Sequence, residues 1–111
     1  KTSFYSGLAL GFLGKKNCDC GFTRVSINEV EFLEKKIDSS TAAVLFEPIQ
    51  GEGGINTFSY EFFKKVKRLC KKNNILLAFD EVQSGIARTG KLFSYQWYGI
   101  SPDIMSLAKG L

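Results

Sequence analysis

The pattern of apolar and polar positions predicts helices and strands in alternation along most of the chain. Apolar residues recur at helical spacing over residues 28–37 and again over 60–73, with charged residues between them. Three short apolar runs, at 41–46, 75–79 and 103–107, are typical of strands buried in a parallel sheet. The order strand, helix, strand, long loop, strand therefore predicts an α/β fold built on a parallel sheet.

Residues with strong capping preferences mark the ends of the two helices. Asn28 is followed three residues later by Glu31, which is a capping-box pattern, and Ser59 precedes the second helix. Asn74 can adopt the left-handed conformation that ends a helix. We expect the second helix to pack on the sheet through its apolar stripe of Phe62, Val66, Leu69 and Cys70.

The composition is that of a globular chain with one class of catalytic residue missing. The 111 residues are 44% hydrophobic and 23% charged, with a net charge of +4 and no histidine. Without histidine, this chain holds no Ser-His-Asp or Cys-His catalytic pair and no Cys₂His₂ zinc site. The chain begins on Lys1 and stops directly after Gly110 and Leu111, so we expect it to be a piece of a longer protein.

The cysteines and the amino-terminal apolar stretch indicate a cellular location. Cys18, Cys20 and Cys70 form no CxxC pair, so we expect free thiols, which favours a reducing compartment and hence the cytoplasm. Residues 4–13 are apolar but about half as long as the roughly 20 residues of a membrane span. They resemble the core of a signal peptide, but an interior segment of a larger fold is the favoured interpretation.

Two features have both a functional and a purely structural interpretation. The basic residues at 64–72 are typical of a phosphate-backbone site in a nucleic-acid-binding module, but a solvated helix face explains them without a partner and is the favoured interpretation. The glycine-rich loop at 51–54 lacks the order of a P-loop or dinucleotide turn. Its Glu52 follows a strand, where α/β sheets bind ligands, although the loop can also be a simple turn.

Asp80 and Lys109 each follow an apolar run, so both charges are predicted at the carboxyl ends of strands. A partly desolvated carboxylate needs a partner, which can be a bound cation, a following turn or Arg88. A partly desolvated lysine loses its proton more readily, and a neutral amine is what condensation with a carbonyl requires. The structural alternative for Lys109 is an ordinary surface lysine.

Three ordered stretches together point to a family. They read FEPIQGEGG at 46–54, AFDEVQSGIARTGK at 78–91 and SPDIMSLAKG at 101–110. In this order and spacing they resemble the class III pyridoxal-phosphate-dependent aminotransferases, most closely the acetylornithine aminotransferases. The resemblance is close over 42–111, includes a helix over 28–38, and is loose over 1–27. It implies that residues 1–111 are a fragment of the large cofactor-binding domain of a fold-type I enzyme.

The resemblance also implies roles for residues that contact the pyridoxal 5′-phosphate cofactor. Lys109 is implied to form the Schiff base with the cofactor and to carry protons during the reaction. Asp80 is implied to pair with the protonated pyridine nitrogen, which keeps the ring an electron sink. Gln83 is implied to bond near the phenolic oxygen and Val82 to press on one ring face, with Glu81 in the same cofactor-contacting stretch.

The implied reaction moves an amino group between N-acetylornithine and 2-oxoglutarate, in arginine biosynthesis, with ornithine or 4-aminobutyrate as alternative donors. Glu52 is implied to lie in the substrate pocket, and Arg88 to be structural. The family's phosphate-binding loop, partner-subunit threonine and substrate-carboxylate arginines lie outside this sequence. The resemblance therefore implies a homodimeric enzyme with small-molecule substrates and no nucleic-acid or membrane partner, of which this fragment is inactive and poorly folded alone.

Overall fold

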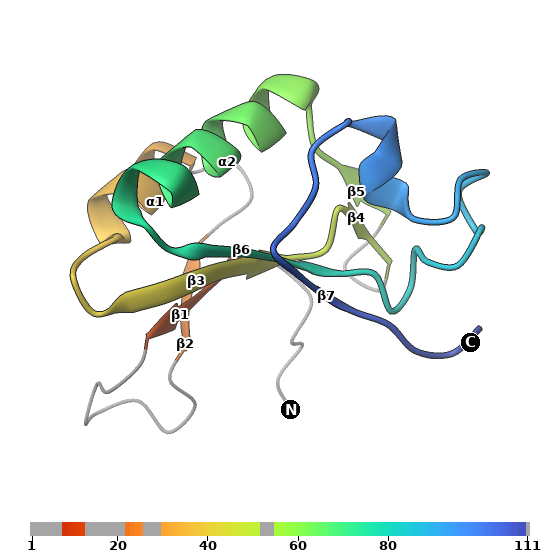
Figure 1. The fold of residues 1–111 in the computed structure, drawn as a ribbon, viewed down its shortest axis with the longest axis horizontal. Coiled ribbons are helices and arrows are strands. Elements are labelled where there is room, and N and C mark those ends of the chain that lie inside the picture. Colours follow the sequence, from red (N-terminus) through yellow and green to blue (C-terminus); the bar gives the residue numbers. More distant parts are fainter. Residues whose placement is uncertain (1–7, 13–21, 26–29, 52–54, 111) are drawn as a thin grey trace.

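A computed structural model describes residues 8–12, 22–25, 30–51 and 55–110 of the chain. It contains two α-helices, seven strands and a short 3₁₀ helix in these ranges (Figure 1). The strands are β1 (Leu8–Phe12), β2 (Phe22–Val25), β3 (Thr41–Phe46), β4 (Ile49–Gln50), β5 (Asn56–Thr57), β6 (Leu76–Asp80) and β7 (Ile104–Ser106). The helices are α1 (Val30–Lys36), α2 (Tyr60–Asn73) and the 3₁₀ helix η1 (Ser94–Trp97).

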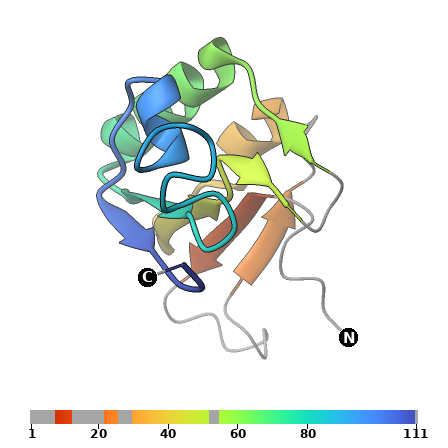
Figure 2. The ribbon, with the colours of Figure 1, turned by 90° about the vertical axis from the view of Figure 1, so that its right-hand side faces the viewer.

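The main sheet confirms the predicted α/β fold. Its strand order is β2-β1-β3-β6-β7, and β3, β6 and β7 are parallel neighbours, as the three apolar runs predicted. β1 pairs antiparallel with both β2 and β3, so part of the apolar stretch at 4–13 is an interior strand of the sheet. α1 and α2 lie on the same side of this sheet (Figure 1), whereas β4 and β5 form a separate two-stranded ribbon (Figure 2).

The core lies between α2 and one face of the sheet. Val44, Phe46, Leu77 and Phe79 alternate along β3 and β6 and are all buried, which is the period-two pattern of a covered face. Phe46 is central, because its ring centroid lies 5.0 Å from that of Phe79 and 5.5 Å from that of Phe63. Phe63 joins the predicted stripe of α2, so this helix buries a wider apolar face than the sequence analysis assigned.

The predicted ends of α2 are confirmed. The Ser59 hydroxyl accepts a hydrogen bond from the Phe62 N–H at 3.2 Å, and Asn74 ends the helix in the left-handed region with φ 54°. The Ile75 N–H still donates to the Cys70 carbonyl, so β6 starts at Leu76, one residue later than predicted. The predicted cap at Asn28 lies outside the described residues, as do Cys18 and Cys20.

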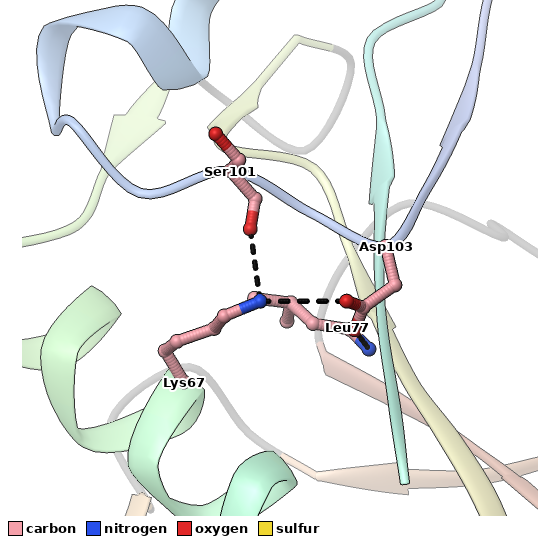
Figure 3. Close-up of polar contacts among 4 residues, drawn as sticks. All are labelled: Lys67, Leu77, Ser101 and Asp103. Atoms are coloured by element: carbon pink, nitrogen blue, oxygen red, sulfur yellow. Dashed lines mark hydrogen bonds and ion pairs between the residues drawn. The ribbon is translucent and has the colours of Figure 1, made fainter.

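The start of β7 is fastened to β6 and α2 by one acidic side chain. The Asp103 N–H donates to the Leu77 carbonyl at 2.7 Å, and its Oδ2 accepts from the Leu77 N–H at 2.8 Å. Lys67 of α2 reaches across to the same place, with its Nζ 3.0 Å from the Ser101 carbonyl and 3.5 Å from Asp103 Oδ1 (Figure 3). These contacts fix how far β7 is shifted along β6.

Candidate active site

The parallel register of β6 and β7 brings the predicted site residues to one edge of the sheet. Asp80, the last residue of β6, lies opposite Ser106, the last residue of β7. Lys109 follows Ser106 by three residues, so Asp80 and Lys109 come after the carboxyl ends of adjacent strands. Figure 2 looks onto this edge and shows the end of the chain beside β7. This is the edge at which open α/β sheets bind ligands.

One oxygen of the Asp80 carboxylate accepts hydrogen bonds from the described residues, and the other does not. Its Oδ1 accepts hydrogen bonds from the Val82 N–H and from the Ser106 hydroxyl, both at 3.0 Å. Among the described residues, Oδ2 accepts no hydrogen bond, and no ion pair joins Asp80 to Arg88. The bond to Val82 is the turn cap foreseen as the structural alternative. The second oxygen is left available to a bound cation.

The side chain of Glu81 is enclosed rather than directed to the sheet edge. It is fully buried, and its Oε2 accepts from the Ser84 hydroxyl and from both the N–H and the hydroxyl of Ser94. Its Oε1 accepts from the Tyr95 N–H at 2.9 Å. Through these hydrogen bonds the carboxylate fastens the loop around η1 to the end of β6. Burial raises the pKa of the Tyr98 phenol, and the charge of Glu81 raises it further.

Gly51, the first residue of the glycine-rich stretch, lies against the segment that follows β6. A Cβ on Gly51 would stand 3.1 Å from both Cβ and Cγ of Gln83, so only glycine fits without moving that side chain. The Glu47 carboxylate, which is buried, accepts a hydrogen bond from the Gly51 N–H at 3.2 Å. Gly51 and Gln83 are thus brought together, whereas Glu52 lies outside the described residues. Val82 is half-buried at the same turn.

Lys109 has an unusual backbone conformation. Its φ is 61°, in the left-handed region that residues with a Cβ seldom occupy, and its side chain is exposed. The Gly110 N–H donates to the Ala108 carbonyl at 2.8 Å, which closes a tight turn around the lysine. Such a conformation costs about 1–3 kcal/mol and is concentrated at functional sites.

Other nucleophiles and the basic helix face give less support to a site. Burial raises the pKa of the Cys70 thiol to about 11, so it is protonated and unreactive near neutral pH. Three lysines of the basic stretch form ion pairs: Lys64 with Glu61, Lys67 with Asp103 and Lys72 with Glu34. Phe62 and Phe63 are buried against the sheet and cannot stack on bases. These features favour a solvated helix face over a nucleic-acid site.

The sequence analysis missed Ser106 as a site residue. It appeared only as a member of an apolar strand, because its role depends on which residue of β6 it opposes. What identifies Ser106 is the register between the parallel strands β6 and β7, because it places Ser106 beside Asp80. In the part of the chain that the structure describes, no helix has the length and apolar character that crossing a membrane requires.

Comparison with known proteins identifies the family of the chain. The family model for aminotransferase class-III matches residues 15–111. The acetylornithine aminotransferase of Mesorhizobium japonicum is 48% identical over 91 residues, which are 82% of this chain and 23% of that protein. The chain therefore spans about a quarter of the length of the curated relatives it matches.

Solved structures give the same result. Plasmodium falciparum ornithine δ-aminotransferase superposes with a TM-score of 0.75 at 42% identity, covering 81% of this chain and 24% of that one. N-acetylornithine aminotransferase from Stenotrophomonas maltophilia superposes with a TM-score of 0.75 at 41% identity, covering 80% and 25%. Taken with the family match over most of its length, these likenesses establish that the chain belongs to the class-III aminotransferases.

Proposed function

We propose that this chain is part of the large cofactor-binding domain of a homodimeric, cytoplasmic enzyme that transfers amino groups with pyridoxal 5′-phosphate. The observation that carries the proposal is the arrangement of Asp80 and Lys109 after the carboxyl ends of adjacent parallel strands. An acid that can pair with a ring nitrogen and an amine that can react with an aldehyde are the two groups this chemistry requires.

The described residues fit such a cofactor. Asp80 has a carboxylate oxygen with no hydrogen bond from the described residues, and this oxygen suits a protonated ring nitrogen. Lys109 would hold the cofactor through its amino nitrogen and move protons at the substrate α-carbon. Val82 and Gln83 would contact the ring, Glu52 would face the substrate, and Glu81 would keep this stretch in place. When bound, the cofactor supplies the electron sink that stabilises the carbanion.

We propose N-acetylornithine as amino donor and 2-oxoglutarate as acceptor, because the chain matches several curated acetylornithine aminotransferases at 44–52% identity. Ornithine is the second candidate donor, since the likeness to ornithine δ-aminotransferase is equally high in TM-score. Comparing kcat/KM for the two donors with the purified full-length enzyme decides between them. A preference for ornithine of tenfold or more would overturn the first assignment.

The central test is the replacement Lys109→Ala in the full-length enzyme, with Lys71→Ala as the matched control on the exposed face of α2. We expect wild type and control to bind pyridoxal 5′-phosphate covalently, so that borohydride reduction fixes it to the Lys109 peptide in mass spectrometry. The Lys109→Ala variant loses this product and falls to background turnover. Trapping of the cofactor on another lysine, with turnover retained, would refute the assignment.

A further inference from the structure

Ser106 makes two contacts with the segment that carries the proposed site. Its hydroxyl donates to Asp80 Oδ1 at 3.0 Å, and its carbonyl accepts from the Glu81 N–H at 3.1 Å. Asp80 Oδ1 also accepts from the Val82 N–H at 3.0 Å. One oxygen of the carboxylate is therefore held by two donors from two different segments, one of which is a neighbouring strand.

The position of Ser106 is set at the opposite end of β7. Asp103 makes two hydrogen bonds with Leu77 and an ion pair with Lys67 (Figure 3). These contacts fasten the residue just before β7 to both β6 and α2. Because the two strands pair residue by residue from this point, Asp80 lies opposite Ser106 at their other end. A slip by one residue would turn Ser106 to the face covered by α2, where it would no longer meet Asp80.

The hydroxyl limits the motion of the carboxylate. Two donors on the same oxygen restrict rotation of the carboxylate, so that the second oxygen keeps a fixed orientation. Loss of the Ser106 hydroxyl leaves the Val82 N–H as the only described donor to Asp80.

We propose that Ser106 is a positioning residue whose hydroxyl holds the Asp80 carboxylate in the orientation that suits the protonated ring nitrogen of pyridoxal 5′-phosphate. This inference rests on the proposed function and deepens it, because it assigns the control of the acidic group to a residue on the adjacent strand. Ser106 itself is not placed in contact with the reacting atoms.

An isosteric pair of variants isolates the hydroxyl. Threonine and valine have the same branched shape and both suit a strand, so Ser106→Thr and Ser106→Val differ mainly in the presence of the hydroxyl. In the full-length enzyme, we expect Ser106→Val to weaken binding of pyridoxal 5′-phosphate by about three- to tenfold relative to Ser106→Thr. Absorbance titration of the cofactor-free enzyme gives the dissociation constants, and circular dichroism confirms that both variants are folded.

Dependence on Asp80 gives a readout that strand stability alone would not move. In an Asp80→Ala background, the two Ser106 variants should bind the cofactor equally, because their effect acts through Asp80.

The outcomes separate this inference from the proposed function. Equal affinities of the two Ser106 variants in the Asp80 enzyme would overturn the inference while leaving the proposed function intact. A difference that persists in the Asp80→Ala background would also overturn it, because Ser106 would then act on the strand and not on Asp80. If the wild-type enzyme does not bind the cofactor at all, the proposed function fails and the inference fails with it.

Discussion

At the scale of single residues, two neighbouring acids at the end of β6 have opposite surroundings. Asp80 keeps one oxygen free of described donors, whereas the Glu81 carboxylate is fully buried and accepts four hydrogen bonds. Successive residues of an extended chain point to opposite sides, so the two acids face different surroundings. The family resemblance implies that both lie in one cofactor-contacting stretch, and only the packing of the loop around η1 distinguishes them.

Replacement of Glu81 tests whether its main role is to hold that loop. In Glu81→Gln, an amide N–H₂ faces donors that need an acceptor, so we expect the free energy of unfolding to fall by about 2–4 kcal/mol. Glu61→Gln is the control, because Glu61 is exposed on α2 and its change should stay within about 0.5 kcal/mol. Urea unfolding of the full-length enzyme measures both. Unchanged stability with weakened cofactor binding would instead assign Glu81 to the cofactor.

At the scale of elements, the regular parts of the fold follow from sequence patterns and the irregular parts do not. α2 and β3 are predicted almost to the residue, because periodicity and capping residues act locally. η1 carries no such pattern, since the Ser94 and Tyr95 N–H groups are bonded to Glu81, which is more than ten residues away in the chain. The candidate site is likewise predicted only in part, because the position of Ser106 beside Asp80 depends on strand register.

The turn after β6 requires glycine at position 85, because the chain there packs closely against the backbone of Glu81. A Cβ on Gly85 would lie 2.9 Å from the Glu81 carbonyl oxygen, to which the Gly85 N–H already donates at 2.8 Å. Because that oxygen belongs to the backbone, the turn must shift, and we expect Gly85→Ala to lower the free energy of unfolding by about 1–3 kcal/mol.

Gly110→Ala provides the matched control for this turn. A Cβ there meets no atom within 4 Å in the described part of the chain, so its effect should be within about 0.5 kcal/mol. Urea unfolding of both variants in the full-length enzyme gives the comparison. Equal stabilities would mean that the turn after β6 adapts to the methyl group without cost.

At the scale of the whole molecule, the sheet is covered by helices on one face only in the described part of the chain (Figure 1). The apolar runs in β3, β6 and β7 are typical of strands that are buried on both faces. On the face away from α2, Leu76 is 45% exposed and Ile104 is 51% exposed. β7 is also the last strand of the described sheet, so one side of its backbone has no partner strand there.

This one-sided cover leads to a prediction for residues 1–111 expressed alone. We expect the isolated polypeptide to bind the dye ANS, to self-associate and to unfold over a broad range of urea, because large apolar side chains stay in water. The substitution Ile104→Lys should reduce dye binding and association of the isolated polypeptide. In the full-length enzyme the same substitution should destabilise, because the remaining chain would bury position 104 against apolar surface. A single sharp transition with no dye binding by the isolated wild-type polypeptide would contradict this expectation, and the described part of the fold would then be stable without a second layer.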